Sequence, residues 1–125
     1  MDKKSTIEFL SALEGYHNLL KTIHWSATNH FEHTLTDDID EDVLGYEDRI
    51  AEAVMGKLNI RFGVGDLKTL MPEAKTLDTL LKELESDILK FKENVGDEPN
   101  NGGVINILDD FLEKVNTWNY LRTLK

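Results

Sequence analysis

Residues 31–60 read FEHTLTDDIDEDVLGYEDRIAEAVMGKLNI, and this stretch decides the fold class. Its apolar residues recur at steps of three and four, which is the period of an α-helix with one buried face. The stripe consists of Leu35, Ile39, Val43, Tyr46, Ile50, Val54 and Leu58. The spacing therefore predicts a long amphipathic helix over residues 31–60.

Three further stretches have the same period, and they predict helices ending near residues 27, 95 and 121. We expect Ser5 or Thr6 to cap the first of these helices, and Pro72-Glu73 to open the third helix of the chain. Gly45 and Gly56 lie inside the 31–60 helix and indicate close packing there. Four helices joined by short or medium links predict an all-α, antiparallel four-helix bundle.

Composition limits the classes of protein that fit. The chain has 125 residues, no cysteine and a formal net charge of −10, so we expect residues 1–125 to form one cytoplasmic domain without disulfides. No apolar run approaches the roughly 20 residues needed to cross a bilayer. An acidic chain repels phosphate backbones, and we expect neither DNA nor membrane binding. The acidity suits attraction of cations, and it equally suits a surface that only keeps the protein in solution.

A second face of the 31–60 helix carries side chains that can bind metal ions. His33, Asp37, Asp48 and Glu52 follow one another at spacings of four, eleven and four residues. At about 100° per residue they project from one side of the helix, away from the apolar stripe. Imidazole with carboxylates suits iron, zinc or manganese. The alternative is a solvated acidic face without a ligand.

The same face shows signs of a contact between subunits. Leu44, Ala51 and Met55 lie among the candidate ligands, which is unusual for an open polar surface. Positions 33 and 52 also share a midpoint with positions 37 and 48. A twofold axis near that midpoint would bring the first pair of one chain to the second pair of another. The pattern predicts a homodimer with two equivalent sites, each built from both chains.

Short motifs over residues 23–53 carry a family resemblance. They are the His24-Trp25 pair, then Phe31, His33 and Asp37, and then the segment Asp48-Arg49-Ile50-Ala51-Glu52. Together they resemble the ferroxidase region of the Dps, or mini-ferritin, branch of the ferritin-like proteins, which has the pattern Asp-x-x-Ala-Glu. The rest of the chain agrees with that branch mainly in the order of its helices.

The resemblance implies a ferritin-like fold and an iron site between subunits. His24, His33 and Asp37 would come from one chain, and Asp48 and Glu52 from the other. Fe(II) would be oxidised, typically by peroxide, and the mineral would be kept in a spherical dodecamer. This sequence departs from the family in its shorter stretch between the two histidines, its lack of a basic N-terminal tail, and its shorter connection between the second and third helices.

Other interpretations of the sequence remain open. A non-enzymatic helical assembly protein, bacterial or phage-encoded, would keep the fold without turnover, and a zinc-stabilised dimer would use the same face. Glu14-x-x-His17 has the form of a di-iron motif but lacks its second copy, so we expect a hydrogen-bonded, packed His17. We expect His30 to be exposed, Trp25 to pack at an interface and Trp118 to lie in the core.

Overall fold

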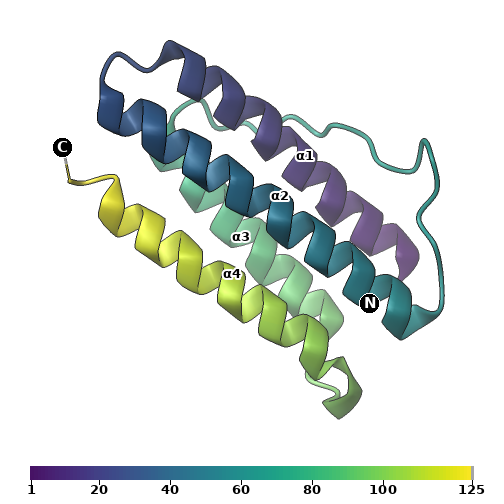
Figure 1. Ribbon diagram of the computed structural model, residues 1–125. Helices are drawn as coiled ribbons and strands as arrows, with labels where there is room; N and C mark the ends of the chain where they lie inside the picture. The colour runs from purple at the N-terminus through teal and green to yellow at the C-terminus, as the bar shows by residue number, and fades with distance from the viewer. Residues whose placement is uncertain (125) are drawn as a thin grey trace.

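The computed structural model describes residues 1–124, and this part of the chain forms a bundle of four α-helices (Figure 1). The helices are α1 (Lys3–Ser26), α2 (His30–Leu58), α3 (Leu77–Val95) and α4 (Gly102–Leu121), with a short 3-10 helix η1 (Pro99–Asn101) before α4. All four predicted helices are present. The predicted domain boundary at residue 125 lies outside the described residues.

Polar side chains cap the starts of α1, α2 and α3, where the backbone amides of the first turn lack partners within the helix. Asp2 caps α1 in a capping box with Ser5, Asn29 caps α2, and Thr76 caps α3. The prediction that Ser5 or Thr6 caps α1 is therefore wrong. Ser5 instead stands at the third helical position and completes the box from inside the helix.

The apolar stripes of the four helices meet in one core, as the periodicity predicts. Phe9 of α1 stacks on Phe91 of α3 with ring centroids 4.5 Å apart, and Tyr46 of α2 stacks on Phe111 of α4 at 4.4 Å. Trp118 is buried beside Phe111, as expected. The largest fully buried aliphatic side chains of this core are Leu10, Leu13, Leu20, Ile39, Ile50, Leu80, Leu81, Leu84, Ile88 and Leu108.

The ends of the helices show how the bundle is arranged. The N-terminal ammonium group donates to the Asn94 carbonyl at 3.1 Å, so α1 begins where α3 ends. At the other end, Arg122 after α4 pairs with Asp78 in the first turn of α3 at 2.9 Å. Phe31 in the first turn of α2 lines a hollow with these two residues. The starts of α2 and α3 therefore lie at the same end of the bundle.

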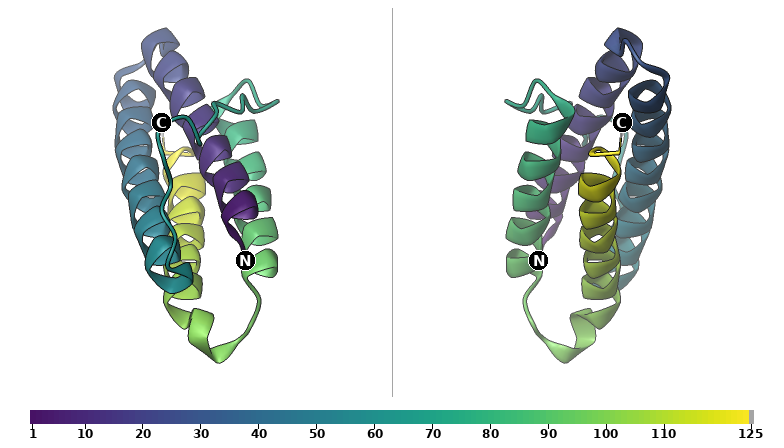
Figure 2. Two further views of the ribbon diagram at one scale, coloured as in Figure 1. Left: turned by 90° about the vertical axis from the view of Figure 1, so that its right-hand side faces the viewer. Right: turned by 90° about the vertical axis from the view of Figure 1, so that its left-hand side faces the viewer.

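Because of this arrangement, residues 59–76 return along the whole length of the bundle; we call them the crossover (Figure 2). Its path is fixed on α1, where Ser11 accepts hydrogen bonds from the amides of Lys68 and Leu70 at 3.0 and 3.1 Å. Pro72-Glu73 belongs to the crossover, and α3 begins only at Leu77. The prediction that Pro72 opens the third helix is wrong.

The close approach of two backbones occurs at a glycine different from those predicted. A Cβ atom at Gly15 of α1 would lie 1.8 Å from the Leu70 carbonyl oxygen of the crossover. At Gly45 and Gly56 a Cβ atom would meet nothing within 4 Å. The prediction of close packing at Gly45 and Gly56 is therefore wrong. The crossover can lie this close to α1 because residue 15 has no side chain.

Candidate functional site

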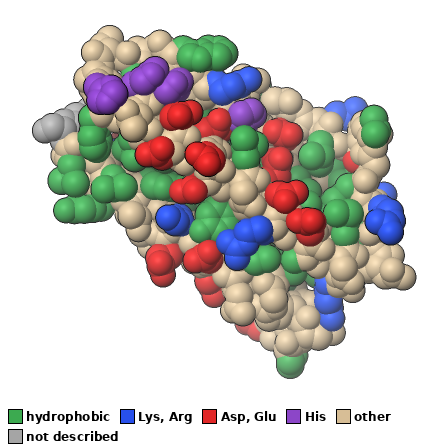
Figure 3. All heavy atoms as spheres, viewed as in Figure 1, with side chains coloured by type: hydrophobic (Ala, Val, Ile, Leu, Met, Phe, Trp, Pro, Cys, Tyr) green, Lys and Arg blue, Asp and Glu red, His purple; other side chains and the backbone are tan. Residues whose placement is uncertain are grey.

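The four side chains predicted on one side of α2 all lie on the protein surface. His33, Asp37, Asp48 and Glu52 are exposed, while the apolar stripe of the same helix is buried from Leu35 to Val54 and partly buried at Leu58. Figure 3 shows histidine and acidic side chains gathered over α1 and α2 on one face of the molecule. We call this surface the α1/α2 face.

At one end of this face, His24 of α1 lies directly on His33 of α2. The two rings are stacked with centroids 3.7 Å apart and planes 20° from parallel. Nδ1 of His24 lies 2.5 Å from the His33 carbonyl oxygen, and Nδ1 of His33 lies 3.0 Å from the His24 carbonyl oxygen. The short link between α1 and α2, which ends at the Asn29 cap, produces this contact.

These reciprocal hydrogen bonds decide which ring nitrogens are free. A carbonyl oxygen only accepts, so Nδ1 of His24 and of His33 must each donate. In a neutral imidazole the proton then resides on Nδ1, and the lone pair of Nε2 is available to a ligand. Metal-binding histidines are commonly oriented in this way by a carbonyl partner of the other nitrogen. The shorter stretch between the histidines therefore does not keep His24 away from His33.

A single chain does not bring all five candidate ligands together. At a rise of about 1.5 Å per residue, Asp37 and Asp48 lie roughly 16 Å apart along the helix axis. Among residues 1–124, no three histidine, aspartate or glutamate side chains are close enough to hold one ion. The structure brings His24 and His33 together, while Asp37 follows His33 one turn later on α2 and Asp48 and Glu52 lie farther along the same helix. A shared metal site requires a second chain.

Polar side chains between α1 and α2 extend the face toward the interior. His17 of α1 pairs through Nδ1 with Asp40 of α2 at 2.6 Å, which confirms the expectation of a hydrogen-bonded histidine. Glu47 of α2 is half-buried, and one of its carboxylate oxygens has no hydrogen-bond partner. Burial, followed by the nearby charges of Glu14 and Asp48, raises the pKa of Glu47 to about 7. Neither Asp40 nor Glu47 follows from the sequence pattern, because their contacts are on another helix.

Apolar side chains are also exposed on this face. Trp25 follows His24 in the last turn of α1 and is 70% exposed, and Leu44 near the middle of α2 is 37% exposed. Ala51 and Met55 are partly buried. His30 is exposed as expected, although it is the first residue of α2 rather than part of a turn. The described chain thus leaves a tryptophan in solvent next to the histidine pair.

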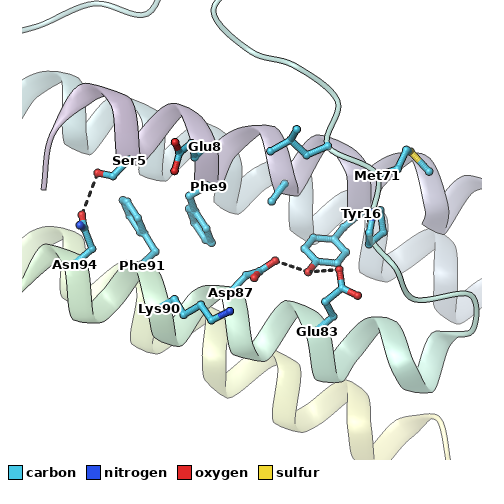
Figure 4. A pocket seen from close by; sticks show the side chains of 13 residues that line it. Ser5, Glu8, Phe9, Tyr16, Met71, Glu83, Asp87, Lys90, Phe91 and Asn94 are labelled. Carbon is cyan, nitrogen blue, oxygen red and sulfur yellow. Dashed lines mark hydrogen bonds between the residues drawn. The ribbon is translucent and has the colours of Figure 1, made fainter.

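A cavity of about 440 Å³ lies between α1 and α3 beneath the crossover (Figure 4). Tyr16 of α1 donates to Asp87 at 2.5 Å and to Glu83 at 3.3 Å. Burial and then the hydrogen bond to Asp87 raise the pKa of Tyr16 well above its usual range, so the hydroxyl stays protonated. Glu83 also accepts from the amides of Glu73 and Ala74 at 3.3 and 3.0 Å. Glu83 therefore anchors the crossover, and Tyr16 links Glu83 and Asp87 to α1.

Comparisons with family models, curated proteins and solved structures gave no match for this chain. None of the described helices has the length and apolar character needed to cross a membrane.

Proposed function

We propose that this chain is a Dps-like iron-binding protein. Two copies pair through the α1/α2 face, and the two sites between them bind Fe(II), promote its oxidation by peroxide or oxygen and sequester the product. His24, His33 and Asp37 of one chain and the partner's Asp48 and Glu52 form each site. Iron is the substrate, and zinc or manganese are the metals that the same donors also suit.

The observation that supports this proposal best is the separation of two incomplete groups on one face. The end of α1 and the start of α2 present two imidazoles, His24 and His33, whose Nε2 atoms are not used by the reciprocal hydrogen bonds, and the carboxylate of Asp37 follows on α2. The later part of α2 presents two exposed carboxylates. In an isologous dimer, the histidine end of one chain's α2 lies opposite Asp48 and Glu52 of the other chain. The twofold axis repeats this pairing, so each dimer has two such sites.

The proposal includes a ferritin-like fold, in which each helix lies antiparallel to the neighbours that it packs against. The crossover supports this part. When the second and third helices of a bundle begin at the same end, the chain needs one long connection between them, and ferritin-like bundles have one such connection. The dodecamer implied by the family resemblance is a further step, which the mass of the assembly tests.

The chemistry of the proposed site follows from its charge. Three carboxylates attract Fe(III) more strongly than Fe(II), because Coulomb attraction scales with the charge of the ion. The site therefore favours loss of an electron from Fe(II) to the oxidant. Two neutral imidazoles add ligands without adding charge, and a ligand set of this size leaves coordination positions open to peroxide or oxygen. The stack of His24 on His33 fixes both rings before iron binds.

The test is Fe(II) oxidation by hydrogen peroxide, followed by absorbance. The variant Asp48→Asn/Glu52→Gln keeps the shape of the surface and should lower the initial rate by about 100-fold, because two iron ligands are lost. The control Asp97→Asn/Glu98→Gln removes the same charge from exposed residues between α3 and α4 and should leave the rate unchanged. Native mass measurement on all three proteins reports whether they remain assembled.

Equal rates for the native chain and the Asp48→Asn/Glu52→Gln variant would exclude a ferroxidase. Assembly that is independent of metal, without oxidation, would then support the non-enzymatic alternative. A dimer whose melting temperature rises with Zn(II), without oxidation of Fe(II), would support the zinc-stabilised dimer.

A further inference from the structure

The α1/α2 face carries an exposed aromatic side chain at one end and a hollow at the other. Trp25 is the exposed side chain, and it lies at the level of the start of α2 because the neighbouring His24 is stacked on His33. Nζ of Lys21 lies 5.9 Å from the centre of the Trp25 ring. A tryptophan in solvent is a strong candidate for an interface anchor, because it buries a large area with little loss of side-chain entropy.

The hollow lies where α2 ends and has a volume of about 440 Å³. It is lined by Glu52, Met55, Gly56, Asn59, Ile60 and Arg61. Two features of the sequence create it. Gly56 has no side chain to fill the space, and Asn59 adopts a left-handed conformation that turns the chain away from the helix axis. The hollow is therefore a property of the α2 terminus itself.

We propose that Trp25 of each chain occupies the hollow of its partner, in the dimer on which the proposed function rests. A twofold axis that places His33 opposite the partner's Glu52 places the start of α2 opposite the end of the partner's α2. Trp25 lies beside the start of α2, and the hollow lies at the end of α2. The same rotation that completes the metal site therefore brings the indole to the hollow, twice in each dimer.

The chemistry of the two parts matches. Met55 and Ile60 offer an apolar lining, and a methionine sulfur makes favourable contacts with aromatic rings. Arg61 supplies a cation at the rim, and cations bind the faces of indole rings. Lys21 next to Trp25 would approach the partner's Glu52, so opposite charges meet at the edge of the contact. A docked indole would also exclude water from the carboxylate of Glu52.

Two variants test this proposal by dimer dissociation in sedimentation equilibrium. Trp25→Ala should raise the dissociation constant by about 30-fold or more, the effect of losing a tryptophan anchor. Gly56→Leu should raise the dissociation constant by a similar factor, because the leucine side chain fills the hollow that receives the partner's indole. Within its own chain a Cβ at Gly56 meets nothing within 4 Å, so this variant should keep the native circular dichroism spectrum.

Controls use residues away from the face. Tyr120→Ala removes another exposed aromatic ring, and Gly103→Leu adds the same side chain to the first turn of α4, where a Cβ also has open space. Both should leave the dissociation constant unchanged. Trp25 emission, taken as the difference between the native chain and a Trp25→Phe variant, should be protected from acrylamide in the dimer and quenched on dilution.

The outcomes separate this proposal from the proposed function. A dimer that oxidises Fe(II) but tolerates Trp25→Ala and Gly56→Leu overturns the docking of Trp25 alone. A dimer weakened by both variants, but with oxidation unaffected by Asp48→Asn/Glu52→Gln, supports the docking and overturns the ferroxidase. A native chain that stays monomeric at all concentrations overturns both.

Discussion

Two faces of α1 use polar residues in opposite ways. On the side of α3, Tyr16 donates to Asp87 and Glu83, and Glu83 accepts two backbone amides of the crossover, so the polar groups are satisfied within the chain. On the side of α2, Asp37, Asp48 and Glu52 are exposed, and Glu47 keeps a buried oxygen without a partner. The first face therefore supports the fold of one chain, and the second is the face through which we propose that metal and a second chain bind.

The largest effect on stability is expected at Gly15, on the face of α1 where the crossover and α3 pack. Gly15→Ala places a methyl group 1.8 Å from the Leu70 carbonyl oxygen, so the crossover must move. Overpacking of this kind should lower the free energy of unfolding by about 3 kcal/mol. Urea denaturation measures the change.

Gly45→Ala and Gly56→Ala on α2 are the matched controls for Gly15→Ala. Because a Cβ meets nothing within 4 Å at either position, each should raise the free energy of unfolding by about 0.5–1 kcal/mol through helix propensity. If Gly15→Ala were stabilising as well, the crossover would not be packed tightly on α1. The α1/α3 face would then not be the tightly packed face of the two.

A smaller effect is expected from Tyr16→Phe. The substitution keeps the ring in the core but removes the donor to Asp87 and Glu83, and the free energy of unfolding should fall by about 2 kcal/mol because a partly buried carboxylate loses its hydrogen bond. Chemical denaturation with Tyr120→Phe as control measures it, since Tyr120 is 62% exposed. Equal stability of the two variants would show that the Tyr16 network contributes nothing to the fold.

The comparison also explains which features the sequence reveals. A helix has a fixed period, so the buried stripe of α2 and the shared side of His33 and Glu52 follow from spacing alone. The contact of His24 with His33 and the function of Gly15 depend on residues from other elements, and no local pattern encodes them. The place of Pro72 in the crossover is hidden for the same reason, because its contact with α1 and the hydrogen bonds that Glu83 accepts from the next two amides are tertiary features.

The smallest expected effect concerns Glu47, the polar group of the α1/α2 face that one chain leaves unsatisfied. Its pKa of about 7 lies above the ordinary glutamate value of 4.5, so the folded state holds a proton more tightly than the unfolded state does. The stability contributed by this proton is fully present below about pH 4.5 and is lost as the pH rises to about 7. Solvent screening at this half-buried site limits the change to about 1 kcal/mol.

Glu47→Gln should remove this pH dependence, because the amide is neutral throughout. The difference in free energy of unfolding between Glu47→Gln and the native chain should therefore grow in favour of the variant from pH 4.5 to pH 7, while Glu93→Gln, an exposed position on α3, should show no such trend. If the native chain and Glu47→Gln ran parallel over this range, the α1/α2 face would be as fully satisfied within one chain as the α1/α3 face. Its half-buried acid would then give no reason to expect a second chain there.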